Sequence, residues 1–270
     1  MSMELIDDEL DVSIATPDAA RAAAFYRGIL GLQELATIEQ GALGVRRRLA
    51  MGGHRIELLE FARAPEQTEG GTERANGIRL LAFILDDLDG VLARMDEAGH
   101  GYRRLPLPEG TPFQVAFSQD ADGNALELVG LARPAGDRLT GRLQIGLTVG
   151  DIGRSRRFYG EQLGLREEPE MRLPRSMGVV GDTRYGFHAG RTTIKFWSRG
   201  PDLPTWSGAP PARTGIRLVT ARVADVDAAH AELRARGVDI VQPPAQGDGG
   251  ARSMFITDPD GNWLEVASPT

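Results

Sequence analysis

The stretch Asp258-Pro259-Asp260-Gly261-Asn262-Trp263-Leu264-Glu265-Val266 contains a tight turn followed by a strand. The proline fixes φ at the second position of the turn, and the glycine adopts the positive φ that a tight turn requires. Side chains then alternate between the two faces of a sheet, so Trp263 and Glu265 share one face. A carboxylate beside a tryptophan on one face of a strand indicates the wall of a pocket rather than a plain surface.

The same pattern occurs 138 positions earlier, as Asp120-Ala121-Asp122-Gly123-Asn124-Ala125-Leu126-Glu127-Leu128. Gly77-Ile78-Arg79-Leu80 recurs as Gly215-Ile216-Arg217-Leu218 at the same offset, whereas Phe25-Tyr26 recurs as Phe158-Tyr159 at an offset of 133. The second copy therefore has five extra residues between Leu165 and Lys195. A repeat that covers nearly the whole chain indicates two related domains. We place them at residues 8–130 and 141–268, joined by a linker at 131–140.

Hydrophobic periodicity predicts the same order of elements in each copy. Val12 and Ile14 alternate with their neighbours and predict a half-buried strand at 11–16. Asp18 suits a helix N-cap, and Gly31 suits the end of that helix. Three strands follow, and the order then begins again with a strand at 80–85. We predict β-α-β-β-β modules, two in each domain, and hence an α+β fold.

Composition excludes several classes of protein. The formal net charge of −7 argues against binding to the phosphate backbone of nucleic acids. No apolar run approaches the roughly 18 residues of a transmembrane helix, and the acidic start of the chain does not resemble a signal peptide. Without cysteine there are no disulfides, no thiolate metal sites and no cysteine nucleophile. We expect a cytoplasmic protein, monomeric or homodimeric, whose partner is a small molecule rather than a nucleic acid or a membrane.

Each copy resembles a domain of the vicinal oxygen chelate superfamily, the group that includes glyoxalase I, methylmalonyl-CoA epimerase, extradiol dioxygenases and bleomycin-resistance proteins. The resemblance is carried by the apolar first strand, the Phe-Tyr and Leu-Gly pairs, the segments Leu85–Asp89 and Val223–Asp227, and the closing Asp-x-Asp-Gly-Asn-x-x-Glu. It implies that the paired modules of each domain curl a mixed sheet into a cradle, which holds a metal in the family. Because this fold hosts several chemistries, the resemblance points to the fold and not to one activity.

The four metal-ligand slots of the family fall on Asp11, Glu57, Leu80 and Glu127 in the first domain, and on Gln144, Lys195, Leu218 and Glu265 in the second. Neither set contains a histidine, whereas the Fe(II) facial triad needs two, so extradiol dioxygenase activity is not expected. Asp11, Glu57 and Glu127 would suit a divalent metal such as Mg²⁺ or Mn²⁺. In the alternative interpretation, Glu57 and Glu127 pair with arginine side chains and hold no metal.

In the second domain, the resemblance places Lys195 opposite Glu265, where an ion pair would replace the charge of a metal. Lys195 is the single lysine among 31 Lys and Arg residues. Trp197 and Trp263 would form flat apolar walls of the same cradle, with Gln144 in a further slot and His188 reaching over the pocket. Alternatively, Lys195 extends to water and the two tryptophans fill a degenerate pocket.

Two functions remain open from the sequence. The first is a protein similar to glyoxalase and bleomycin-resistance proteins that binds a small organic ligand, aromatic or conjugated, in the cradle of the second domain. It would need no His-based metal site and no cofactor. The alternative is a lyase, isomerase or epimerase that uses carboxylates for proton transfer, with Lys195 and Glu265 as catalytic groups or a divalent metal in the first domain.

Overall fold

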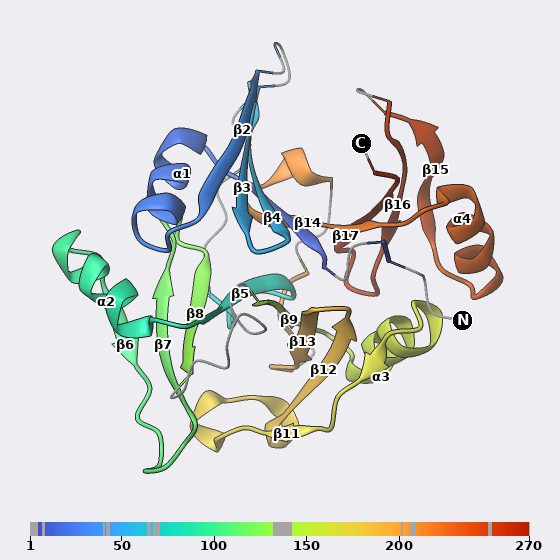
Figure 1. Cartoon of the computed structure of the whole chain (residues 1–270). Coiled ribbons are helices and arrows are strands. Elements are labelled where there is room, and N and C mark those ends of the chain that lie inside the picture. The colour runs from blue at the N-terminus through green and yellow to red at the C-terminus, as the bar shows by residue number, and fades with distance from the viewer. Residues whose placement is uncertain are drawn as a thin grey trace.

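The structure is a computed structural model that describes residues 5–6, 9–39, 41, 44–63, 66, 71–131, 142–200, 202–205, 209–247 and 250–269. It consists of two curled sheets, with helices packed against their outer faces (Figure 1). None of the helices in these ranges is long and apolar enough to cross a membrane.

The first half of the chain follows the predicted order of elements. It forms β1 (Asp11–Ala15), α1 (Ala19–Gly28), β2 (Gln33–Glu39), β3 (Val45–Met51), β4 (His54–Glu60), β5 (Gly77–Leu85), α2 (Leu88–Glu97), β6 (Tyr102–Arg104), β7 (Phe113–Gln119) and β8 (Ala125–Leu131). Asp18 caps α1 as expected, because its carboxylate accepts a hydrogen bond of 2.8 Å from the backbone N–H of Arg21.

The second half repeats this order and adds short helices in the segment that carries the extra residues. It forms β9 (Arg142–Thr148), α3 (Ile152–Arg156), the π-helix η3 (Arg157–Gln162), β10 (Arg166–Glu167), β11 (Met171–Arg172), the 3₁₀ helices η4 (Arg175–Met177) and η5 (Val180–Asp182), β12 (Thr183–Ala189), β13 (Thr192–Trp197), the 3₁₀ helix η6 (Pro210–Ala212), β14 (Gly215–Arg222), α4 (Val226–Ala235), β15 (Ile240–Gln246), β16 (Arg252–Thr257) and β17 (Trp263–Ala267).

Each sheet takes one module from each half of the chain. The 8-stranded sheet has the order β15-β16-β17-β14-β1-β4-β3-β2, and the 9-stranded sheet has the order β10-β12-β13-β9-β5-β8-β7-β6. The halves meet where β1 pairs antiparallel with β14 and where β5 pairs antiparallel with β9. The first module of the first copy therefore completes its sheet with the second module of the second copy.

The α+β class, the tandem copies and the mixed sheets predicted from the sequence are confirmed. The pairing of the modules differs from the expectation that each domain curls a sheet of its own. Of the linker predicted at 131–140, only Leu131 belongs to the residues that the structure describes.

The closing motif is a structural device that ties the turn before β17 to the first helix of the same copy. The buried carboxylate of Asp258 accepts hydrogen bonds from the backbone N–H groups of Asp260 and Asn262 and from the hydroxyl of Tyr159, at 2.8–3.0 Å. Asp120 and Tyr26 repeat this bond at 2.8 Å in the first copy. In each copy, the tyrosine of the Phe-Tyr pair is therefore hydrogen-bonded to the first aspartate of the Asp-x-Asp-Gly-Asn motif.

Candidate functional site

The inner face of each sheet, opposite the helices, carries the candidate residues. We name the inner face of the 9-stranded sheet, which holds Lys195 and Glu127, the lysine cradle. We name the inner face of the 8-stranded sheet, which holds Glu57 and Glu265, the carboxylate cradle. In both sheets the alternate residues pack into the core beneath the helices, as Ile194 and Phe196 do beside Lys195.

The centre of the lysine cradle is an ion pair between a buried lysine and a half-buried glutamate. Lys195 is 3% exposed, and its Nζ lies 2.5 Å from Oε2 of Glu127. The predicted pairing of Lys195 with Glu265 is wrong, because β13 lies in the sheet of β8, whereas Glu265 on β17 lies in the other sheet. Taking two charges out of water is costly, and each partner makes the burial of the other tolerable.

Apolar side chains close one end of the lysine cradle. Trp197 and Leu80 form a buried cluster with Val179, and the partly buried Leu173 and Met177 pack against it. The last three side chains come from the segment around η4 and η5, in the region where the second copy is longer. The longer segment of the second copy thus supplies part of the apolar cluster at this end of the lysine cradle.

A glycine makes room for the tryptophan ring. A Cβ at Gly146 would lie 2.8 Å from Cβ of Leu80 and 3.3 Å from Cη2 of Trp197, so any side chain here would displace these two residues. The indole Nε1 of Trp197 is buried and has no hydrogen-bond partner among the described residues. A buried N–H without an acceptor costs free energy, and a ligand acceptor would remove that cost.

Gln144 and His188 complete the lysine cradle. Gln144 pairs with Thr193 on one side and with Ala82 on the other, so it lies on the inner face between the strands of Lys195 and Glu127. His188 stands on β12 at the rim, where its Nε2 lies 3.1 Å from Oε1 of Glu168. Strand register therefore places Lys195, Trp197, Gln144 and His188 on one face of the 9-stranded sheet.

Glu168 is a residue that the sequence analysis missed. Its carboxylate accepts hydrogen bonds from Arg184 at 2.5 Å and from Thr193 at 3.4 Å, and it lies over Gly186, whose missing side chain leaves the space. Glu168 lies in the segment where the two copies differ in length, so comparison of the copies gave no counterpart for it.

The carboxylate cradle contains two glutamates from different halves of the chain. Glu265 accepts a hydrogen bond of 2.9 Å from Thr220, and Glu57 accepts one of 2.8 Å from Arg48. Burial raises the pKa of Glu265 and repulsion from Glu57 adds to the rise, whereas hydrogen bonds from Thr220 and Ser253 oppose it.

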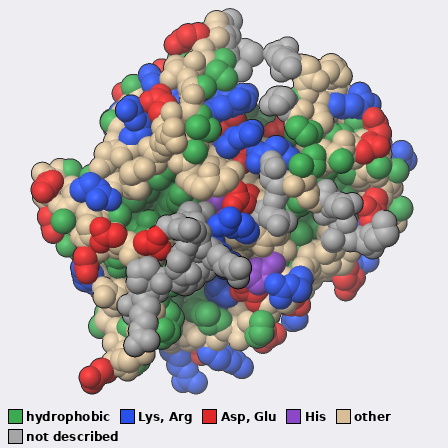
Figure 2. Space-filling view, in the orientation of Figure 1, with side chains coloured by type: hydrophobic (Ala, Val, Ile, Leu, Met, Phe, Trp, Pro, Cys, Tyr) green, Lys and Arg blue, Asp and Glu red, His purple; other side chains and the backbone are tan. Residues whose placement is uncertain are grey.

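Basic side chains and an aromatic pair line the rest of the carboxylate cradle. Figure 2 shows basic side chains, coloured blue, in the hollow between the arms of the 8-stranded sheet. In this sheet Arg46 and Arg48 pair with Glu57. Trp263 packs against Phe255 with ring centroids 5.6 Å apart. Trp263 therefore lines a different cradle from Trp197, and the prediction that both tryptophans wall one pocket is wrong.

The three predicted metal ligands do not converge. Asp11 and Glu57 lie in the 8-stranded sheet, whereas Glu127 lies in the 9-stranded sheet. Each carboxylate also meets a cationic side chain: Asp11 pairs with Arg222, Glu57 with Arg48 and Glu127 with Lys195. This resembles the alternative interpretation, although the partner of Glu127 is the lysine.

A metal of the kind that the resemblance implies does not fit the slots of the lysine cradle. In the lysine cradle the slots hold Leu80, which has no donor atom, and Lys195, which is committed to Glu127. In the described part of the chain, no group of three or more His, Cys, Asp or Glu side chains is arranged to hold a metal ion. Carboxylates that are already neutralised by arginine or lysine are poor ligands for a hard cation.

Comparison with known proteins agrees with this geometry. The chain is similar to glyoxalase I from Zea mays, whose crystal structure matches 96% of this chain and 91% of that chain with a TM-score of 0.76 and 19% sequence identity. At this identity the likeness shows the fold alone. The chain is also 31% identical to the Escherichia coli (strain K12) protein YaeR over 119 residues, which is 43% of this chain and 91% of YaeR.

The sequence profile of one family matches the chain twice, at residues 10–128 and 141–266. The two matches coincide with the two copies of the repeat and together reach every strand of both cradles. The chain belongs to the Glyoxalase/Bleomycin resistance protein/Dioxygenase superfamily.

Proposed function

We propose that the lysine cradle binds a small organic molecule that carries a hydrogen-bond acceptor and a flat aromatic or conjugated portion, without a metal. The observation that carries this proposal is the buried Lys195–Glu127 pair beside Trp197, whose indole N–H lacks a partner among the described residues. Buried donors of this kind favour an acceptor atom in the cradle.

Each residue of the lysine cradle would contact a different part of the ligand. Lys195 has three N–H donors and gives one to Glu127, so it can donate another to a carbonyl oxygen of the ligand. Trp197 and Leu80 offer apolar area to the ring, and an aromatic contact contributes about 0.5–1.5 kcal/mol beyond its buried area. Gln144 would contact a polar group at the centre, and His188 would contact one at the rim. The cradle is shared by both halves of the chain, rather than belonging to the second domain alone.

Tryptophan fluorescence tests the proposal. Acetophenone, which has a ring and a carbonyl, serves as the first probe, and we expect a saturable change in emission. Trp197→Phe should abolish this change, whereas Trp263→Phe is the matched control in the other cradle and should retain it. A response that disappears with Trp263→Phe and survives Trp197→Phe would refute the assignment to the lysine cradle.

A second candidate function rests on the carboxylate cradle. We infer that Glu57 and Glu265 serve an isomerase, epimerase or lyase reaction, with one carboxylate as general base and the other as general acid. Support comes from their unequal surroundings: Glu57 accepts from Arg48, while burial raises the pKa of Glu265. A carboxyl group with a raised pKa can hold a proton and act as the general acid.

Hydrogen exchange tests this second candidate. The protein would be incubated in D₂O with a panel of small 2-oxo and 2-acyl acids, and the loss of C–H signals would be followed by proton NMR. Glu265→Gln should stop any exchange, and Glu168→Gln in the other cradle should not. Equal exchange in the parent and in Glu265→Gln would refute the role. The cytoplasmic location and the monomeric or homodimeric state stay predictions.

A further inference from the structure

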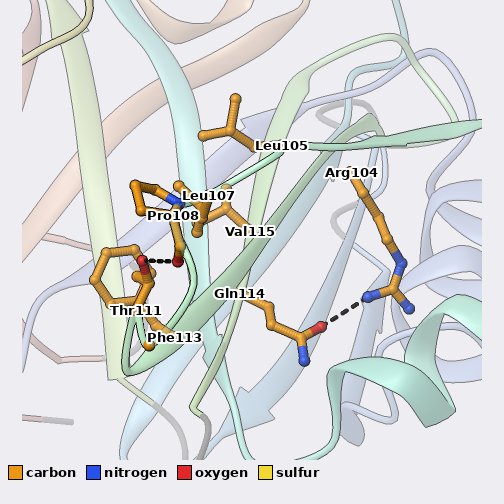
Figure 3. A pocket seen from close by; sticks show the side chains of 9 residues that line it. Arg104, Leu105, Leu107, Pro108, Thr111, Phe113, Gln114 and Val115 are labelled. Carbon is orange, nitrogen blue, oxygen red and sulfur yellow. Dashed lines mark hydrogen bonds between the residues drawn. The ribbon is translucent and has the colours of Figure 1, made fainter.

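A pocket of about 220 Å³ lies on the outer arm of the 9-stranded sheet, where the chain passes from β6 to β7 (Figure 3). Polar and apolar groups share its lining, and the apolar part includes Leu105, Leu107, Phe113 and Val115. Arg104 also borders it, but its guanidinium donates to Asp89 at 2.5 Å and to Gln114 at 2.7 Å. Figure 3 shows Arg104 and Gln114 turned toward each other and away from the leucines. The pocket therefore suits an uncharged group.

Strand register places the apolar part of this pocket on the same face as the lysine cradle. On β7 and β8, Phe117 pairs with Glu127 and Val115 pairs with Val129. Residues directly opposite each other in an antiparallel pair share a face, and so do alternate residues of one strand. Val115 and Phe113 consequently lie on the face of Glu127. Leu105 joins them, because its backbone N–H donates to the carbonyl of Val115 at 2.8 Å.

The register also fixes the order of features along the cradle. Trp197 pairs with Thr148, Lys195 with Gly146, and Gln144 with Ala82, so the polar centre follows the tryptophan end. Ala82 in turn pairs with Glu127, which is level with Phe117. With a rise of about 3.3 Å per residue, Val115 lies about 7 Å and Phe113 about 13 Å beyond that level. The sequence of features is thus a flat apolar end, a polar centre and a second apolar pocket.

We propose that the ligand of the lysine cradle is an elongated amphipathic molecule, with its ring at Trp197, a neutral carbonyl at Lys195 and an apolar tail in the pocket of Phe113. This inference rests on the proposed function and adds the class of ligand to it. The acceptor is neutral because Glu127 already balances the charge of Lys195 and repels a second carboxylate. The tail is apolar because Leu105, Leu107, Phe113 and Val115 supply the walls.

A homologous series of phenyl ketones tests the length of the site. Acetophenone, butyrophenone, hexanophenone and octanophenone share the ring and the carbonyl and differ only in the alkyl tail. If the tail enters the pocket, affinity rises roughly fourfold for each added methylene, as expected for burial of apolar surface, until the pocket is full. Titration followed by Trp fluorescence or calorimetry gives the affinities.

Phe113→Asp separates the tail from the head of the ligand. Phe113 is 37% exposed, so the fold does not depend on it, and a carboxylate there should remove the advantage of octanophenone while leaving acetophenone unchanged. Val241→Asp is the matched control, since Val241 is 45% exposed at the edge of the other sheet. This control should bind the whole series as the parent does.

The outcomes separate the inference from the proposed function. If all four ketones bind with equal affinity, or if Phe113→Asp leaves the series unchanged, the tail site is refuted while binding at the lysine cradle stands. If none of the ketones binds and the emission of Trp197 never responds, the proposed function falls and the tail site falls with it.

Discussion

A buried ammonium group is tolerable in a protein only with a counter-charge, and Lys195 has its counter-charge in the other half of the chain. The pair with Glu127 holds together β13 and β8, which are not neighbours in the sheet. Removal of one partner leaves the other charge buried and unpaired, which costs more than the pair itself contributes.

We therefore expect Lys195→Met to lower the free energy of unfolding by about 3 kcal/mol, because Glu127 loses its partner. The double variant Lys195→Met with Glu127→Gln should recover most of the loss. Arg157→Ala, which removes an exposed pair with Glu161, is the control and should cost less than about 0.5 kcal/mol. Urea unfolding measures all three, and a double variant no more stable than Lys195→Met would contradict the pairing.

Asp260 gives a prediction for pH dependence. Burial and then repulsion from Asp258 raise the pKa of Asp260 to about 6, from an ordinary value of 3.8. Between pH 3.8 and about pH 6 the folded protein therefore holds a proton on Asp260 that the unfolded chain has released. The stability that comes from the protonated form is present below about pH 4 and is lost as the pH rises through 6.

The backbone N–H of Gly150 donates a hydrogen bond of 3.1 Å to the carboxylate of Asp260. The variant Asp260→Asn keeps an oxygen that can accept this bond, but its side chain cannot ionise. The fall in the free energy of unfolding between pH 4.5 and pH 7, taken from urea unfolding at a series of pH values, should therefore be smaller in the variant than in the parent. Parallel pH curves for the two proteins would show that Asp260 does not titrate as described.

Among the elements, β9 depends on the absence of a side chain at Gly146. A methyl group there would press on Leu80 and on the ring of Trp197, both of which lie on the inner face of the sheet. The same glycine lets the side chains of neighbouring strands cover the middle of the cradle, so a change on one strand alters the walls built by two others.

Gly146→Ala should lower the free energy of unfolding by about 1–3 kcal/mol through overpacking, and it should shift the fluorescence of Trp197. Gly101→Ala is the control, because a Cβ at Gly101 meets nothing within 4 Å. Thermal unfolding and emission spectra would be compared for both variants. An unchanged emission maximum in Gly146→Ala would mean that the ring is not held against β9.

The elements themselves could be predicted from the sequence because their signals are local. Asp18 caps its helix as expected, and the strand predicted at 11–16 is β1 at Asp11–Ala15. The pairing of modules could not be predicted, because β5 and β14 both begin with Gly-Ile-Arg-Leu. Nothing in the residues next to β1 selects one of these strands over the other, so the candidate slots were assigned to the wrong sheets.

In the candidate site, too, the features within one half of the chain could be predicted, and the contacts between the halves could not. Lys195, Trp197, Gln144 and His188 lie in one half of the chain and meet in one cradle, because alternation along strands is a local property. Glu127, rather than the predicted Glu265, lies in the sheet of Lys195, because the placement of these glutamates depends on strand pairing between the two halves of the chain. Glu168 was missed because a carboxylate in an irregular segment carries no periodic signal.

Across the whole fold, neither half closes a sheet on its own. Residues 1–131 would leave β1 without β14 and β5 without β9, so two central strands would become open edges that bear Val12, Ile14, Leu81 and Phe83. Open strand edges next to apolar side chains recruit another chain.

The isolated fragment 1–131 should therefore associate, with β1 of one copy meeting β5 of another, and should elute at twice its own mass or more. Mixing it with the fragment 142–270 should give a one-to-one complex of the same size as the intact protein. Size-exclusion chromatography with light scattering decides this, and a stable monomeric fragment would contradict the exchange of modules.

The exchange of modules also constrains how such a protein can diverge after its gene segment is duplicated. Each cradle takes residues from both copies of the repeat. The lysine cradle takes Glu127 from the first copy and Lys195 from the second, and the carboxylate cradle takes Glu57 from the first and Glu265 from the second. Neither copy can specialise in one site while the other keeps the ancestral one. A change of ligand preference at either cradle therefore requires substitutions in both copies.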